Sequence, residues 1–161
     1  METTHLETER IAGELRKAVH GSAWHGPALF ELLADVTPSV AASRPIAGAH
    51  SIEEIVRHLA TWLDVVRERL DGRHRDIADA EDWHSAGDHS ASAWQELVAR
   101  VKDSAERLAT RIEQFPDDAL GDRLPGAAPS ASSAYATLHG SVQHVLYHAG
   151  QIAVLKKGSG S

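Results

Sequence analysis

The residues best suited to chemistry in this sequence are two histidines, His144 and His148, which lie four positions apart near the C-terminus. In a helix, residues at i and i+4 project from one face, so both imidazoles can reach the same ion. Imidazole nitrogen is a good ligand for zinc and nickel, with zinc–nitrogen distances of about 2.0–2.1 Å. The spacing is equally compatible with a pair of surface histidines, because the chain holds 11 histidines among 161 residues.

A third histidine, His58, lies in another predicted helix, one turn before Trp62 and on the flank of the apolar stripe. A side chain at that position faces a neighbouring helix, and it can meet His144 and His148 if the two helices lie side by side. Three neutral imidazoles leave a coordination position open, as catalytic zinc sites do and closed structural sites do not. The alternative is a buried neutral histidine that is hydrogen-bonded to Glu54, one turn earlier.

Two further histidines, His25 and His139, also bear on the predicted metal site. His25 lies in the helix-breaking segment 24–27, and from such a turn it can supply a fourth ligand or an acid–base group; we take it as the candidate catalytic residue, with an exposed turn histidine as the alternative. His139 lies on the same predicted helix as His144 and His148 but points away from the face that they share, so it is not assigned to the metal. Because Val145 rather than glutamate follows His144, the pair lacks the general base of the zinc-protease helix motif.

The sequence predicts an all-α fold, because apolar residues recur at the helical period and alternating β-type runs are weak. Each amphipathic stripe must be covered by another, which favours a four-helix bundle in a single domain over residues 1–157. The Gly/Ser segment 158–161 is expected to be a flexible tail. Two long connections, 73–90 and 116–133, permit a topology other than up-down-up-down. The expected helices are 4–20, resuming after Gly26-Pro27 to about residue 37, then 51–70 with a capping box at its start, 92–115 and 133–157.

Composition excludes several classes of function. With 16 Lys+Arg against 23 Asp+Glu, the chain carries a net charge of −7, which disfavours binding to nucleic acid. No apolar run reaches the ~20 residues of a membrane span, and the polar N-terminus does not resemble a signal peptide, so we expect a cytoplasmic protein without membrane contact. Without cysteine, any thiolate in a reaction must come from a small molecule.

The histidine segments carry a resemblance to a known family. Residues 49–52 (AHSI) leading to 58–62 (HLATW), together with 144–152 (HVLYHAGQI), resemble the DinB-like superfamily, and the similarity extends over about residues 10–156. The resemblance implies a four-helix bundle with a divalent metal site, typically zinc or nickel, and His58, His144 and His148 as its ligands. Some members are transferases for low-molecular-weight thiols such as bacillithiol or mycothiol, one branch is a mycothiol-dependent isomerase, and many others are described as metal-dependent hydrolases.

Three functions remain open at this point. The first is a metal-dependent enzyme that activates a small thiol or water, with an electrophilic small-molecule substrate lying over an apolar pocket near Trp62 and Trp24. The second is a binding or stress-response module in which the ion is structural or sensory. The third is a helical scaffold without metal. The frequency of symmetric dimers among small proteins favours a homodimer.

Overall fold

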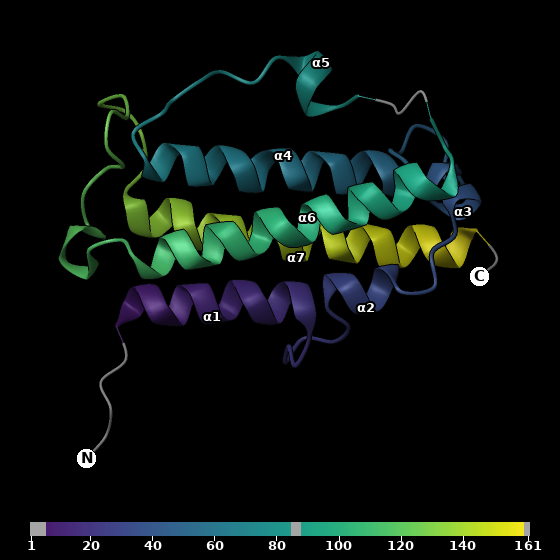
Figure 1. Ribbon diagram of the computed structural model, residues 1–161, viewed down its shortest axis with the longest axis horizontal. Coiled ribbons are helices and arrows are strands. Elements are labelled where there is room, and N and C mark those ends of the chain that lie inside the picture. The colour runs from purple at the N-terminus through teal and green to yellow at the C-terminus, as the bar shows by residue number, and fades with distance from the viewer. Residues whose placement is uncertain (1–5, 85–87, 160–161) are drawn as a thin grey trace.

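The computed structural model describes residues 6–84 and 88–159, which contain helices and no β-strand. Four long helices form the bundle shown in Figure 1, so the predicted all-α class is confirmed. Short helices lie in the connections between them. The long helices are α1 (Glu7–His20), α4 (Ile52–Leu70), α6 (Ala91–Glu113) and α7 (Ala134–Gly158), and the short ones are α2 (Leu29–Leu33), α3 (Pro38–Ala42), α5 (Asp79–Asp82) and the 3-10 turn η1 (Asp117–Ala119).

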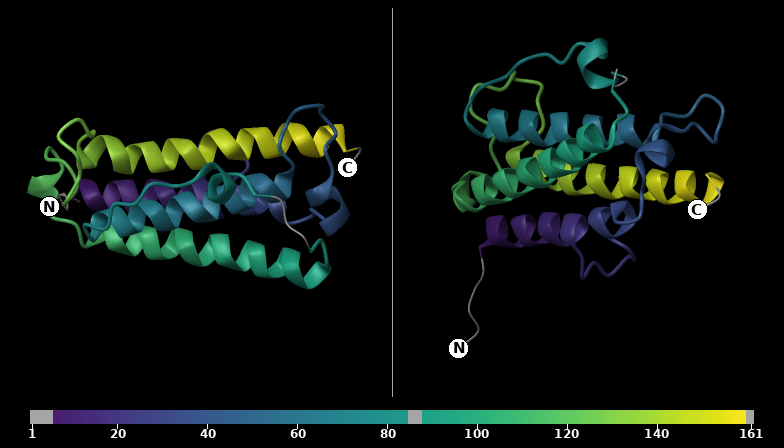
Figure 2. Two further views of the ribbon diagram at one scale, coloured as in Figure 1. Left: turned by 90° about the horizontal axis from the view of Figure 1, so that it is seen from above. Right: turned by 45° about the vertical axis from the view of Figure 1, so that its right-hand side comes forward.

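The bundle departs from simple up-and-down order. α4 packs against α6 and α7, and α1 packs against the same two helices from the other side. Figures 1 and 2 show that α4 and α6 run toward one end of the molecule, whereas α1 and α7 run toward the other. α4 and α6 are parallel because the connection at residues 71–90 returns along the length of the bundle, over the outer side of α4. α4 and α7, which carry the candidate ligands, are therefore antiparallel neighbours.

Helix α4 begins and ends as its sequence predicts. The Ser51 hydroxyl accepts the N–H of Glu54, and the Glu54 carboxylate accepts the N–H of Ser51, which is a complete capping box. Beyond the last helical residue, Gly72 has φ +77°, a conformation that side chains with a Cβ disfavour. One face of the helix lies in the core, through Ile52, Ile55, Val56, Leu59, Leu63 and Leu70.

The first helical arm is interrupted, as predicted. α1 ends at His20, and Gly21 and Gly26 both have positive φ in the break that follows. The chain resumes as α2, where the N–H of Ala28 donates to the carboxylate of Glu31 at 2.7 Å. A further short helix, α3, was not predicted. It forms because Pro38 occupies the first helical position and the Thr37 hydroxyl accepts the N–H of Val40.

Several helix boundaries differ from the sequence prediction, including the end of α6 at Glu113 rather than 115. α6 begins at Ala91, with Ser90 rather than Ser92 as its N-cap, because the Ser90 hydroxyl accepts the N–H of Ala93. α1 begins at Glu7 with Leu6 at the N-cap, and the expected cap Thr4 lies outside the described residues. At the other end, α7 continues through Gly158, one residue into the expected tail; residues 160–161 lie outside the described range.

None of the helices in the described part of the chain combines the length and the apolar character that crossing a bilayer requires.

A substitution in the core tests this architecture directly. Leu108 of α6 is fully buried, so replacing it with alanine should lower the free energy of unfolding by about 2–5 kcal/mol. Val154 of α7 is mostly exposed, and Val154→Ala is the matched control, with an expected change within about 0.5 kcal/mol. Urea denaturation followed by circular dichroism measures both. Equal losses in the two variants would contradict the assignment of these faces.

Candidate metal centre

The three histidines singled out in the sequence lie together between α4 and α7. His58 Nε2 lies 2.9 Å from His144 Nε2, and His148 Nε2 lies 3.0 Å from the same atom. One ring nitrogen from each residue lies within 4.8 Å of the other two. His58 and His148 are buried and His144 is half-buried. Nitrogens held tetrahedrally at about 2.0–2.1 Å from zinc are roughly 3.3–3.4 Å apart, so the cluster is close to the size that an ion needs.

The outer nitrogens of two rings fix which nitrogen is free to bind an ion. His58 Nδ1 lies 2.7 Å from Asp82 Oδ1, and His148 Nδ1 lies 2.6 Å from Gln151 Oε1. Gln151 Oε1 is an acceptor, so Nδ1 carries the proton in His148 and Nε2 presents its lone pair. The Asp82 carboxylate lies at ion-pair distance from His58 Nδ1 without forming a hydrogen bond of good geometry, and its charge favours the same tautomer in His58. Two lone pairs therefore point at His144 Nε2. A single proton there can satisfy one of them, whereas a cation satisfies all three nitrogens.

Burial keeps these imidazoles neutral. Desolvation lowers the pKa of both His144 and His148 to about 4, and for His144 the neighbouring His148 acts in the same direction. Burial also lowers the pKa of His58, against the opposing effect of the Asp82 carboxylate. At neutral pH all three rings are thus neutral, which is the state in which imidazole binds a metal. A neutral three-imidazole set fits a divalent ion of the zinc or nickel type.

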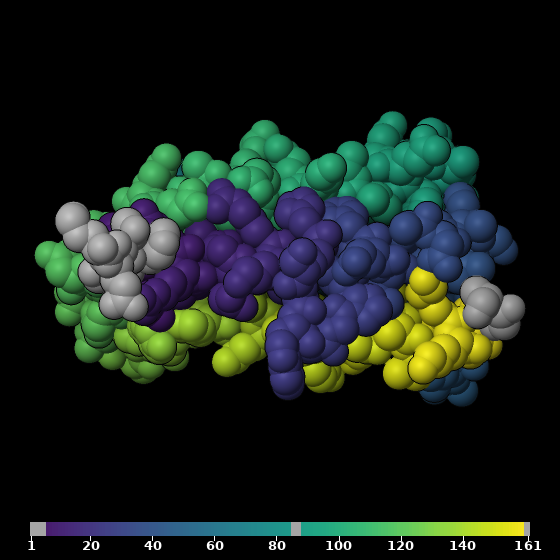
Figure 3. Space-filling model, turned by 90° about the horizontal axis from the view of Figure 1, so that it is seen from below, coloured from purple at the N-terminus to yellow at the C-terminus, as the bar shows by residue number. Residues whose placement is uncertain are grey.

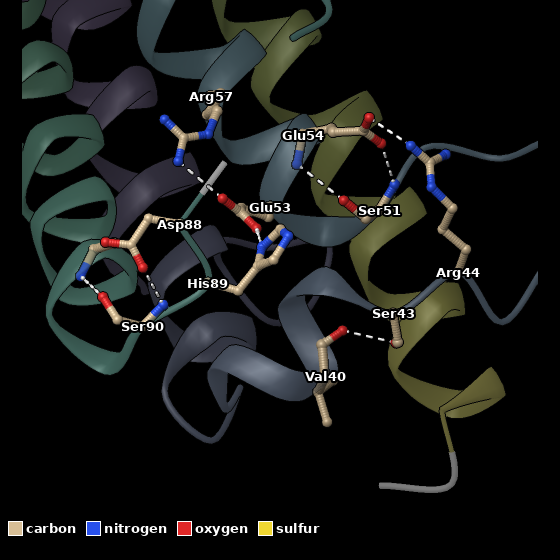
Figure 4. A network of polar contacts seen from close by, with 11 residues as sticks. Val40, Ser43, Arg44, Ser51, Glu53, Glu54, Arg57, Asp88, His89 and Ser90 are labelled. Carbon is tan, nitrogen blue, oxygen red and sulfur yellow. Dashed lines mark hydrogen bonds and ion pairs between the residues drawn. The ribbon is translucent and has the colours of Figure 1, made fainter. Parts of the chain in front are cut away.

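Asp82 is the partner that holds His58, and the sequence did not indicate it. The Asp82 carboxylate also accepts the indole N–H of Trp62 at 2.6 Å. It belongs to α5, within the connection 73–90. The alternative in which Glu54 bonds to His58 does not hold, because Glu54 bonds to Ser51 and to Arg44 instead (Figure 4).

Next to Asp82, the ring of Trp83 lies between two histidines. Its centroid is 4.0 Å from that of His58 and 3.7 Å from that of His50, and each pair of planes differs by 8°. His50 is thereby part of an aromatic stack behind the His58 ring. Trp83 covers one face of the His58 imidazole and so restricts its rotation. Like Asp82, Trp83 falls in a segment without helical periodicity, so no sequence signal placed it here.

The connection between α4 and α6 contacts α4 a second time, close to the start of α6. Buried Glu53 in the first turn of α4 accepts from Arg57 and lies 2.8 Å from the Nδ1 atom of His89 (Figure 4). The contacts of Asp82 and His89 thus attach the connection to α4 at two points.

A cavity of about 380 Å³ opens beside the histidines. Its wall includes the rings of His58, His144 and Trp62, which places Trp62 where the sequence predicted an apolar pocket. Trp24 does not join it, because its side chain is fully exposed on another part of the surface. The cavity is of the size that binds a small organic ligand.

His25 lies elsewhere. It is exposed on the 21–28 segment, which projects over α7 on the face opposite α5 (Figures 1 and 3). There it lines two other hollows with Leu146, and neither contains any of the three clustered histidines. His139 is also separate, with its Nε2 3.7 Å from Glu7, as its position on the helix predicted.

The fold and the site agree with the family comparison. The model of the DinB superfamily matches residues 23–152, which is most of the chain, and the chain belongs to that superfamily. Searches of curated proteins and of solved structures found no match. The three-histidine cluster is compatible with metal binding, as membership of this superfamily leads one to expect.

Removing the charge of Asp82 tests its part in the site. Asp82→Asn keeps the size of the side chain but weakens the hold on the His58 Nδ1 proton, so zinc affinity should fall about 10- to 100-fold. Asp79→Asn, on the exposed first residue of α5, is the control and should bind zinc like the wild type. Competition with a chromophoric chelator measures the affinities. Wild-type affinity in Asp82→Asn would show that the contact does not support the ligand.

Proposed function

We propose that this protein binds one divalent metal ion, zinc or nickel, through His58, His144 and His148, and that it is an enzyme acting on a small molecule. The observation that carries the proposal is the convergence of three Nε2 atoms, two of them on rings that Asp82 and Gln151 hold from behind. A divalent ion at such a site lowers the pKa of a bound thiol or water and so supplies a nucleophile near neutral pH.

The surrounding residues serve binding and orientation. Asp82 and Gln151 hold two imidazoles in position, and Trp83 covers the outer face of His58. The cavity next to His58 and His144 receives the second reactant, with Trp62 as an apolar wall. In the thiol reaction this reactant is an electrophile, and the protein acts as an S-transferase; with water it acts as a hydrolase. Since the chain has no cysteine, a thiol reactant is a low-molecular-weight cosubstrate.

Metal content and turnover, measured on the same samples, test the proposal. Wild-type protein loaded with Zn²⁺ or Ni²⁺ should hold about one ion per chain. It should conjugate a low-molecular-weight thiol to 1-chloro-2,4-dinitrobenzene, or hydrolyse 4-nitrophenyl acetate, above the uncatalysed rate. His148→Ala should lose both properties, because two ligands remain. His139→Ala, on the same helix but off the ligand face, should retain both.

Two results would count against the proposal in different ways. A metal content near zero after loading would remove the metal site itself. A full metal content with equal turnover in the wild type and His148→Ala would remove the enzyme and leave an ion that stabilises the fold. In that case chelation should lower the melting temperature of the wild type, since a ligand bound only to the folded state stabilises it.

A further inference from the structure

The cavity beside the histidines contains an arginine that has no carboxylate partner. Arg69, in the last turn of α4, lines this cavity, and among the described residues no ion pair involves it. Its Nε atom is buried and has no hydrogen-bond partner. The guanidinium carbon lies 5.5 Å from the centroid of the Trp62 ring, a cation–π contact that leaves the N–H groups free for an acceptor.

Neighbouring arginines on the same helix differ from Arg69. Arg57 is paired with Glu53 at 2.8 Å, and Arg67 lies 3.9 Å from Asp71. The Nε atoms of Arg57 and Arg67 are also buried without a hydrogen-bond partner, so what distinguishes Arg69 is that no carboxylate pairs with its guanidinium. Guanidinium is the side chain best matched to a carboxylate because it offers two parallel N–H groups. Arg69 therefore has the chemistry of an anion-binding residue, and it lines the cavity beside the histidines.

The position of Arg69 relative to the histidines defines the shape of the occupant. Arg69 follows His58 by about three helical turns, so both residues and Trp62 lie on one face of α4. The Trp62 ring centroid is 6.2 Å from that of His58, which places one aromatic ring between the guanidinium and the histidine cluster. Leu63 and Val66 complete the wall along this path.

The charges in the cavity favour one orientation. Asp82 also lines it, but at the histidine end, where its Oδ1 atom already accepts from Trp62 and lies against His58. The hydroxyls of Thr137 and Ser141 donate to carbonyls of their own helix, so they offer no free donor to an anion. Among the described residues that line the cavity, Arg69 is the only lysine or arginine.

We infer that this cavity binds a small amphipathic carboxylate, with the carboxylate on Arg69, the apolar body against Trp62, Leu63 and Val66, and the opposite end at His58 and His144. The role of that opposite end as the reacting end rests on the proposed function. The carboxylate subsite itself does not, because it is formed by residues that do not depend on an ion.

Isothermal titration with 3-phenylpropionate, compared with its neutral analogue 3-phenylpropanamide, tests the subsite. Wild-type protein should bind the carboxylate at least tenfold more tightly than the amide, in both the zinc-loaded and the chelator-treated protein. Arg69→Gln should weaken carboxylate binding tenfold or more, whereas Arg69→Lys should retain part of it. Arg73→Gln is the control, because Arg73 is an exposed arginine outside the cavity that pairs with Asp71.

A second variant tests the cavity without removing a charge. Gly140 of α7 lines it, and a Cβ built there would meet no atom within 4 Å, so the side chain of Gly140→Leu has room to start into the cavity and should occupy part of it. Binding of 3-phenylpropionate should fall at least tenfold. Gly13→Leu is the matched control, since Gly13 lies in α1, outside this cavity, and also has open space around its Cβ. Circular dichroism melts confirm that each variant is folded.

The possible results separate the subsite from the metal centre. Loss of binding in Arg69→Gln and Gly140→Leu, with retention after chelation, supports the subsite even if turnover is absent and the proposed function fails. Equal binding of the carboxylate and the amide overturns the inference. Binding that disappears on chelation but survives Arg69→Gln also overturns it, because the carboxylate would then be bound by the ion.

Discussion

The convergence of three imidazole nitrogens on one point is the interaction on which the rest of the site depends. A neutral His144 has at most one proton to offer at Nε2, so at least one facing lone pair is left without a partner, and burial disfavours the extra proton of a charged ring near neutral pH. The scaffold holds the three nitrogens there because α4 and α7 are antiparallel neighbours whose other faces are committed to the core. A divalent cation is a partner for all three nitrogens, which is why the donor set points to a metal.

The connection at residues 71–90 links the topology to the chemistry. It must return along the bundle so that α4 and α6 can run in parallel, and on its way it places Asp82 and Trp83 against His58. Without this connection, α4 and α7 would leave the Nδ1 atom of His58 with no carboxylate beside it. The same segment that sets the order of the helices therefore also holds the His58 ring. Asp82 and Trp62 in turn form the wall of the cavity that reaches Arg69.

Much of the site was readable from the sequence, for reasons that particular residues make clear. The relation between His144 and His148 follows from the helical period, and the place of His58 on the margin of an apolar stripe indicates that it faces a neighbour. Asp82, Trp83 and Gln151 act through contacts that local patterns do not encode. The exact start of α6 is a second feature that the sequence did not determine. Both Ser90 and Ser92 are good N-caps, and Ser90 is the one used because the intervening Ala91 favours extending the helix.

X-ray absorption at the zinc edge, on wild-type protein loaded with one equivalent of zinc, tests the central claim most directly. Bound as described, the ion should show the multiple-scattering pattern of about three imidazoles, with nitrogen at about 2.0–2.1 Å and room for at least one further light ligand. A spectrum with oxygen neighbours alone, or with a single imidazole, would contradict a centre formed by His58, His144 and His148.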